Sequence, residues 1–243
     1  MNWHKASLFV RGYSFLARNR AAGMVIDKTL DLFAWLDYRI LILLTMWHPD
    51  MGHRIKYLRR RGVQVGEHVF LDFGVFIEIT APRSVVIEDY AAVGYGCMVY
   101  AHDALLNAVA DLPVRIRTTR LGYNCVVGVG STILSGVTVG RHSLVAPGSL
   151  VTKDVPDGTV VAGRPARHLM TCEELVLSWQ EDMKAHPEVY YDTPHPNRAP
   201  STPFDSAIAW RREGVGIRHW TEIRTGTPFD HILDYKAMRT RGE

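Results

Sequence analysis

The middle of this 243-residue chain predicts a mainly β fold in which short strands stack as successive coils. The main observation is that an aliphatic residue returns at every sixth position, in three separate registers. These positions are Val65, Leu71 and Ile77; Ile87, Val93 and Val99; and Leu121, Val127, Ile133, Val139, Val145 and Val151. Because Val, Ile and Leu make up about a quarter of the chain, chance agreement has a probability on the order of 10⁻⁷ before the choice of register.

Two further positions share the six-residue period. The residue after the aliphatic is small or acidic in most units, as at Gly66 and Gly128, and the fourth residue after it is small or Val, as at Cys97 and Ser131. Alternation of inward and outward side chains is typical of half-buried strands, and glycines suit the tight corners between them. A sandwich of hairpins would need turns at irregular intervals of about 8 to 12 residues, so stacked coils are the better interpretation.

The period is broken at two places. The step from Ile77 to Ile87 is ten residues, which predicts a bulge around residues 82–85, and the step from Val99 to Leu121 is 22 residues, which predicts a loop over residues 104–120. Loops that leave a rigid scaffold are common places for function. A histidine stands immediately before the longer loop, and we therefore expect the site at His102.

The repeat resembles the left-handed parallel β-helix of hexapeptide-repeat acyltransferases that modify sugars and antibiotics. Two segments carry the resemblance: MVYAHDALLN, in which a histidine precedes an excursion loop, and RLGYNCVVGVGSTILSGVTVGRHSLVAPGSLVTKDVPDGTVVAGRPARHL, which ends in a Gly-x-Pro-Ala segment. The following TCEELVLSWQEDMKAHPEVYYDTP is similar to the tail of acetyltransferases of surface polysaccharide and O-antigen pathways. The resemblance implies an acetyl-CoA-dependent O-acetyltransferase acting on a sugar hydroxyl, with a serine-type or other small acceptor as the alternative.

By that resemblance, His102 is the general base that takes a proton from the acceptor hydroxyl during direct transfer. An imidazole with an ordinary pKa near 6.5 suits this role at neutral pH. Asp103 is a candidate partner for the other ring nitrogen, but adjacent residues on a strand point to opposite faces, so a carboxylate from a neighbouring coil or subunit stays open. A backbone N–H near Gly128 or Gly130 would stabilise the developing oxyanion.

The resemblance also implies a homotrimer that holds acetyl-CoA in the groove between adjacent subunits, without a metal. Carried over to this sequence, the cofactor contacts are Gly128, Gly130, Ala146, Gly148, Ser149, Lys153, Arg164, Pro165 and Arg167. Lys153 and Arg164 are equally explicable as solvated surface charges. A covalent route through Cys97 is disfavoured, because this cysteine takes a small-residue position where a buried thiol acts as a small hydrophobe.

Two interpretations of other classes are disfavoured. A zinc enzyme resembling γ-class carbonic anhydrases needs three histidines that meet across a subunit interface. Three repeats make one triangular coil. If the two breaks do not change which side of the triangle each later repeat occupies, His68 and His142 lie on one side of the coil and His102 on another. A non-catalytic repeat scaffold would need neither the histidine nor the long loop.

The period divides the chain into a basic helical N-terminal segment (1–64), the β-helix domain (65–168) and a C-terminal helix with an extension (169–243). The first segment holds eleven Lys and Arg against four Asp and Glu, without a pattern typical of nucleic-acid binding. Its stretch 29–47 predicts a helix that stops at His48-Pro49, and the longest apolar run in it, Ile40 to Trp47, is far short of the roughly 18 residues that a membrane span requires. We expect it to pack against the protein itself or a sister subunit, with peripheral contact to an anionic membrane surface as the alternative.

At the other end, Thr171 and Glu174 predict a capping box that opens a helix. The packing stripe expected on this helix is Leu175, Trp179 and Met183. Beyond residue 194 no period is clear, and Trp210 and Trp220 are aromatic platforms on which a sugar would stack. Three cysteines without a preceding signal peptide favour a reducing, cytoplasmic setting.

Overall fold

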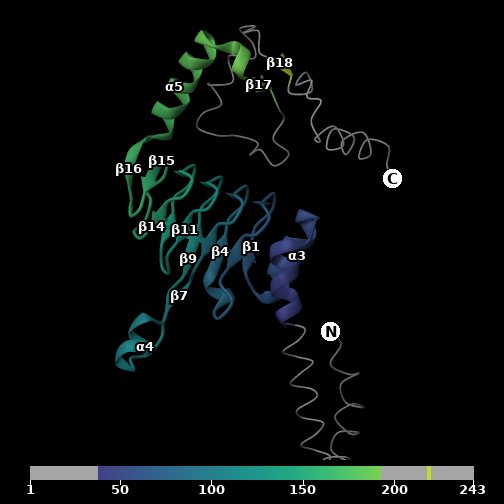
Figure 1. Cartoon of the computed structure of the whole chain (residues 1–243), viewed down its shortest axis with the longest axis vertical. Coiled ribbons are helices and arrows are strands. Elements are labelled where there is room, and N and C mark those ends of the chain that lie inside the picture. Colours follow the sequence, from purple (N-terminus) through teal and green to yellow (C-terminus); the bar gives the residue numbers. More distant parts are fainter. Residues whose placement is uncertain (1–37, 193–217, 220–243) are drawn as a thin grey trace, which may run out of the picture.

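The computed structural model describes residues 38–192 and 218–219, and a parallel β-helix forms its centre (Figure 1). Face 1 contains β1 (Gln64–Val65), β4 (Val85–Ile87), β9 (Thr119–Leu121) and β12 (Thr138–Val139). Face 2 contains β2 (Phe70–Leu71), β5 (Ala92–Val93), β10 (Val126–Val127) and β13 (Leu144–Val145). Face 3 contains β3 (Phe76–Ile77), β6 (Met98–Val99), β11 (Thr132–Ile133) and β14 (Leu150–Val151).

The chain follows these faces in order, and three turns close each coil. We call the turn from face 1 to face 2 corner 1, the turn from face 2 to face 3 corner 2, and the turn from face 3 to face 1 corner 3. Strands of successive coils pair in parallel, so that Leu71 lies opposite Val93, and Val93 lies opposite Val127. The inward aliphatic residues therefore stack in rows, as the six-residue period predicts.

The core is the column of these inward residues. Every predicted aliphatic position from Leu71 to Val151 is buried, and Val65 is half-buried against the same cluster. Each buried Val, Leu or Ile side chain contributes about 1.5–3 kcal/mol relative to an exposed one. The repeat therefore supplies both the geometry of the coils and most of the apolar surface that holds them together.

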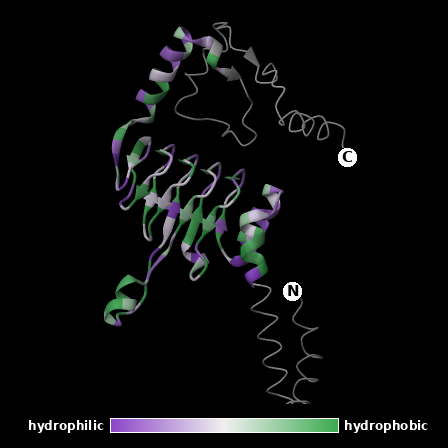
Figure 2. Cartoon of the chain, viewed as in Figure 1, coloured by the Kyte–Doolittle hydropathy of each residue, from purple (hydrophilic) through white to green (hydrophobic). Residues whose placement is uncertain are grey.

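Both breaks of the period lie at corner 3. The shorter break forms a turn of 3₁₀ helix, η2 (Pro82–Ser84). The longer one forms an antiparallel arm of β7 (His102–Asp103) and β8 (Arg115–Ile116), with α4 (Leu105–Ala110) at its tip. The arm projects away from the coils, and its tip is largely hydrophobic (Figures 1 and 2). Both breaks therefore open the same corner, and the arm of β7, α4 and β8 starts two residues before the expected loop, while β9 begins at Thr119.

The N-terminal helices close the first coil. Residues 38–47 are helical, and α3 (Met51–Arg61) follows, between an N-cap at Asp50 and a left-handed C-cap at Gly62. Leu58 of α3 is buried in the core cluster. The predicted helix end at His48-Pro49 is confirmed for the described residues, and none of the described helices is long and apolar enough to cross a membrane. Contact of this segment with a membrane or sister subunit stays a prediction.

Three arginines of α3 satisfy the carbonyls that the first coil leaves unpaired. In later coils the inward residue's carbonyl accepts an N–H from the coil before it, as Val93 O does from Asp72 N at 3.0 Å. The first coil has no predecessor, and arginine side chains take that place. Arg59 Nε donates to Val65 O at 3.0 Å, Arg54 Nη2 donates to Leu71 O at 2.6 Å, and Arg61 Nη2 donates to Ile77 O at 2.9 Å. Part of the basic excess of the N-terminal segment therefore has a structural role at the end of the solenoid.

The last coil continues into β15 (Thr159–Gly163), which pairs with β13 and then with antiparallel β16 (Ala166–Thr171). Helix α5 (Cys172–Ala185) follows and begins with the predicted capping box of Thr171 and Glu174. Beyond it lie η3 (Pro187–Val189), β17 (Tyr191–Asp192) and β18 (Arg218–His219).

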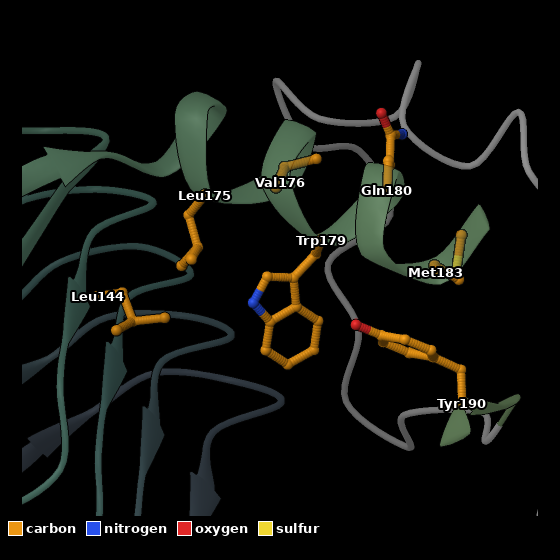
Figure 3. A pocket seen from close by; sticks show the side chains of 7 residues that line it. All are labelled: Leu144, Leu175, Val176, Trp179, Gln180, Met183 and Tyr190. Atoms are coloured by element: carbon orange, nitrogen blue, oxygen red, sulfur yellow. The ribbon is translucent and has the colours of Figure 1, made fainter. Parts of the chain in front are cut away.

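The apolar stripe of α5 packs only in part. Met183 is buried, but 62% of Trp179 is exposed, and both side chains line an open apolar pocket with Leu144 and Tyr190 (Figure 3). Trp210 and Trp220, the expected stacking platforms, lie outside the described residues.

Coil stacking predicts that an added methyl group inside a corner destabilises the fold. A Cβ on Gly122 would lie 2.7 Å from Val139 O in the next coil. We expect Gly122→Ala to lower the free energy of unfolding by about 1–3 kcal/mol in urea titrations. Gly52→Ala is the control, because Gly52 lies in α3 and its Cβ would meet only the Asp50 side chain, at 3.1 Å. Equal stability of the Gly122 variant and wild type would contradict this packing.

Candidate active site

Corner 3 brings together Glu78 and His102, which lie 24 positions apart in the sequence. Strand β3 pairs with β6 in the next coil, with Ile77 opposite Val99. Glu78 follows β3 directly, and its N–H donates to Val99 O at 2.9 Å. His102 begins the projecting arm just beyond β6. Stacking of adjacent coils therefore places the carboxylate beside the histidine.

The carboxylate of Glu78 is fully buried and surrounded by donors. Its Oε2 lies 2.7 Å from His102 Nδ1 and accepts the N–H of Ala101 at 2.9 Å and that of His102 at 3.1 Å. Its Oε1 accepts the N–H of Thr80 at 2.6 Å and that of Ala81 at 3.3 Å. Burial opposes ionisation, but the backbone donors and the histidine outweigh it and lower the pKa of Glu78 to about 2.

The ionised carboxylate fixes the role of each ring nitrogen of His102. A carboxylate without a proton can only accept hydrogen bonds, so Nδ1 carries the proton in this contact. The lone pair of Nε2 is then available as a base, and the carboxylate stabilises the imidazolium that forms. The His102 side chain is 24% exposed, whereas Glu78 is at 0%. The pair therefore presents one partly accessible basic nitrogen, oriented from beneath by a buried anion.

Asp103, the candidate partner adjacent in sequence, does not contact the His102 ring. Its Oδ2 accepts from Arg115 Nη2 at 2.8 Å, and its Oδ1 accepts from Leu105 N at 3.1 Å. Because neighbouring residues on a strand point to opposite sides, Asp103 of β7 faces the arm while His102 faces the coil below. The partner of His102 is Glu78, which matches the alternative of a carboxylate from a neighbouring coil.

The small residues expected to bind CoA gather at corner 2, away from His102. They are Gly128, Gly130, Ala146, Gly148 and Ser149. Gly130 and Gly148 adopt left-handed φ angles of 69° and 71°, and a Cβ on either would meet no atom within 4 Å.

Two N–H groups at this corner take part in the ladder between coils. Gly128 N donates to Val145 O at 2.8 Å, and Gly130 N donates to Tyr95 O at 2.9 Å. An oxyanion donor near these glycines is therefore not the N–H of Gly128 or Gly130 itself, and its identity stays a prediction.

The basic residues expected near the phosphates of CoA fall into two groups. Lys153 and Arg167 line one cavity of about 280 Å³ around the last coil, together with His168. Arg164 and Pro165, joined by a cis peptide bond, form the turn between β15 and β16, in line with corner 2.

The other candidate chemistries find no support in the geometry. His68 and His142 lie at corner 1, whereas His102 lies at corner 3, so these three side chains do not converge within one chain. No group of three His, Cys, Asp or Glu within the described ranges is arranged to hold a metal. Burial raises the pKa of the Cys97 thiol, which disfavours it as a nucleophile.

Comparison with known proteins agrees with this architecture. No protein-family model matches the chain. YvoF of Bacillus subtilis (strain 168) is named as an acetyltransferase and is 32% identical to this chain over 151 residues. The match covers 61% of this chain and 82% of YvoF. Serine acetyltransferase 2 of Arabidopsis thaliana is 34% identical over 174 residues, 72% of this chain, and the match spans 48% of that relative's length.

A solved hexapeptide-repeat-containing acetyltransferase of Vibrio cholerae O1 biovar eltor, complexed with acetyl coenzyme A, is also similar. It aligns with a TM-score of 0.41 and 22% identity over 55% of this chain and 84% of its own. The family assignment depends instead on the match that spans most of YvoF, together with the six-residue period and the coils it builds. The chain belongs to the hexapeptide-repeat acetyltransferases.

Proposed function

We propose that this protein transfers an acetyl group from acetyl-CoA to a hydroxyl of a sugar or surface-polysaccharide precursor, with His102 as the general base. The observation that carries the proposal is the 2.7 Å contact between His102 Nδ1 and the buried, ionised Glu78. A histidine oriented in this way is suited to removing a proton from a hydroxyl. Family membership supports acetyl-CoA as the donor.

The proposed reaction is a direct transfer in a ternary complex. Nε2 of His102 takes the hydroxyl proton as the acceptor oxygen attacks the carbonyl carbon of the thioester. The carbon–sulfur bond then breaks, and the departing thiolate receives the proton from the imidazolium. The products are an acetyl ester and CoA, and the protein forms no covalent bond.

Two observations bear on the acceptor. The similarity of residues 171–194 to the tails of polysaccharide acetyltransferases favours a sugar hydroxyl. The 34% identity with a serine acetyltransferase favours the hydroxyl of serine as the second candidate. Both acceptors present an alcohol to the same base, so one assay distinguishes them.

The separation of corner 2 from corner 3 supports a homotrimer with sites between subunits. The segment from Gly130 to Gly136 crosses face 3, and six residues of extended chain span roughly 20 Å. The thioester, by contrast, must come within about 3.5 Å of the attacking oxygen. A neighbouring subunit that sets its corner 2 beside His102 would complete the site. The proposed contacts to CoA are then Gly128, Gly130, Ala146, Gly148, Ser149, Lys153, Arg164, Pro165 and Arg167.

Removal of the base tests the proposal directly. With acetyl-CoA and maltose, a methyl galactoside or L-serine, we expect His102→Ala to lower acceptor-dependent thiol release by about 10²–10⁴-fold. His68→Asn is the control, since His68 lies at corner 1 and Asn tolerates its left-handed φ of 56°. Unchanged turnover in His102→Ala would overturn the assignment of the base. Turnover with serine alone would overturn the sugar acceptor.

The low pKa of Glu78 predicts a stability that depends on pH. The folded value of about 2 lies below the usual 4.5, so the carboxylate stabilises the fold above pH 4.5 and loses this contribution as the pH falls toward 2. The pH-dependent part amounts to about 3 kcal/mol. In urea titrations from pH 7 to pH 2.5, we expect the stability difference between wild type and Glu78→Gln to shrink with falling pH. A constant difference would contradict the ionised carboxylate.

A further inference from the structure

The N-terminal helices hold the corner that carries Glu78. Three consecutive carbonyls, those of residues 77–79, accept hydrogen bonds from this segment. Arg61 Nη2 donates to Ile77 O at 2.9 Å and to Glu78 O at 2.6 Å, and the Tyr38 hydroxyl donates to Ile79 O. The backbone of Glu78 is thereby fixed from the outer side of the first coil.

Arg61 is itself held in place. The residue is 7% exposed, and its Nη1 donates to the hydroxyl of Thr45 at 3.1 Å, which in turn donates to Ile42 O. Burial lowers the pKa of the guanidinium, while Tyr38 and the Glu78 carboxylate oppose that effect. The cation therefore joins the helix at 38–47, helix α3 and corner 3 in one buried contact.

Glu78 lies between this cation and His102. On one side its carbonyl accepts from Arg61, and on the other its carboxylate accepts from the N–H and the ring of His102. Without Arg61, the carbonyls of Ile77 and Glu78 would lose a charged donor, and the short segment that aims the carboxylate would be free to shift. Displacements of about 1 Å near a reacting group cost up to about a hundredfold in rate.

We propose that Arg61 is a positioning residue of the active site, which holds Glu78 so that its carboxylate orients His102. The proposal rests on the proposed function of His102 as the base. It assigns the N-terminal segment a part in catalysis through Arg61, which binds the backbone of Glu78.

The chain supplies a matched control in Arg54. This arginine belongs to the same helix, is equally buried and binds the carbonyl of Leu71 in the same coil. It lies over the ring of Phe73 at corner 2, with its guanidinium carbon 4.3 Å from the ring centroid. Substituting Arg54 or Arg61 removes the same kind of end contact, but only Arg61 binds Glu78.

The decisive measurement is the Nδ1–H proton of His102 by NMR, which needs no acceptor. A short hydrogen bond to a carboxylate moves this resonance downfield of the amide region, and Glu78→Gln and His102→Ala identify it by its loss. We expect Arg61→Gln to lose or shift the resonance and Arg54→Gln to keep it. Retention of the same resonance in Arg61→Gln would overturn the proposal.

Kinetics supply the second readout. In thiol release from acetyl-CoA with the same acceptor panel, we expect Arg61→Gln to lower kcat about 10–100-fold with little change in the KM for acetyl-CoA. Arg54→Gln should lower thermal stability without this loss of kcat. Equal kcat in the two variants would reduce Arg61 to a structural role.

Two further variants keep the proposal testable if Arg61→Gln does not fold. Arg61→Lys keeps the charge but cannot bind two carbonyls and Thr45 as a fork. Tyr38→Phe keeps Arg61 and removes the hydroxyl that binds Ile79 O and interacts with the guanidinium. Arg61→Lys and Tyr38→Phe should each move the NMR resonance and lower kcat. If neither variant does so, the proposal is overturned. Full activity of His102→Ala would instead reject the proposed function, while the NMR comparison would still decide whether Arg61 positions the pair.

Discussion

Closure of each coil is the constraint on which the rest of the structure depends. The aliphatic side chains stack in rows only if every coil returns to the same three faces, so that strands lie about 4.8 Å apart. Extra residues within a face would move every later side chain out of its row. Insertions are therefore tolerated at corners, and both insertions in this chain lie at corner 3. The candidate site is found where the lattice of coils is interrupted.

This interruption also explains how a carboxylate is buried there. In regular coils the corner N–H groups donate to the next coil, as Gly128 N does to Val145 O. At corner 3 the N–H groups of Thr80, Ala81 and Ala101 are directed instead at Glu78. A buried anion is stable only when such donors replace water. The break in the period therefore creates the donors that keep Glu78 ionised beside His102.

The features of this arrangement that depend on the six-residue period could be predicted from the sequence. The contacts that depend on how coils stack on one another could not. The aliphatic rows, the two breaks, the capping box of α5 and the place of His102 before the arm all follow from spacing. Glu78 occupied a repeat position where acidic residues are ordinary. Its contact with His102 depends on how the extra residues between Ile77 and Ile87 are placed at corner 3. The ten-residue spacing alone does not show this placement.

The same limit applies to the oxyanion donors and to the arginines of α3. Glycines at a corner indicated exposed N–H groups, but whether an N–H is available depends on the ladder, and the N–H groups of Gly128 and Gly130 are engaged. The sequence alone assigned no role to the arginines of α3. In the structure they bind carbonyls of the first coil, which no earlier coil is present to pair. A solenoid must cover its terminal carbonyls and core. Here the covering helix α3 lies one coil from His102. Its Arg61 therefore binds both a terminal carbonyl of the first coil and the backbone of Glu78. The helix that caps the solenoid thus also supports the proposed active site.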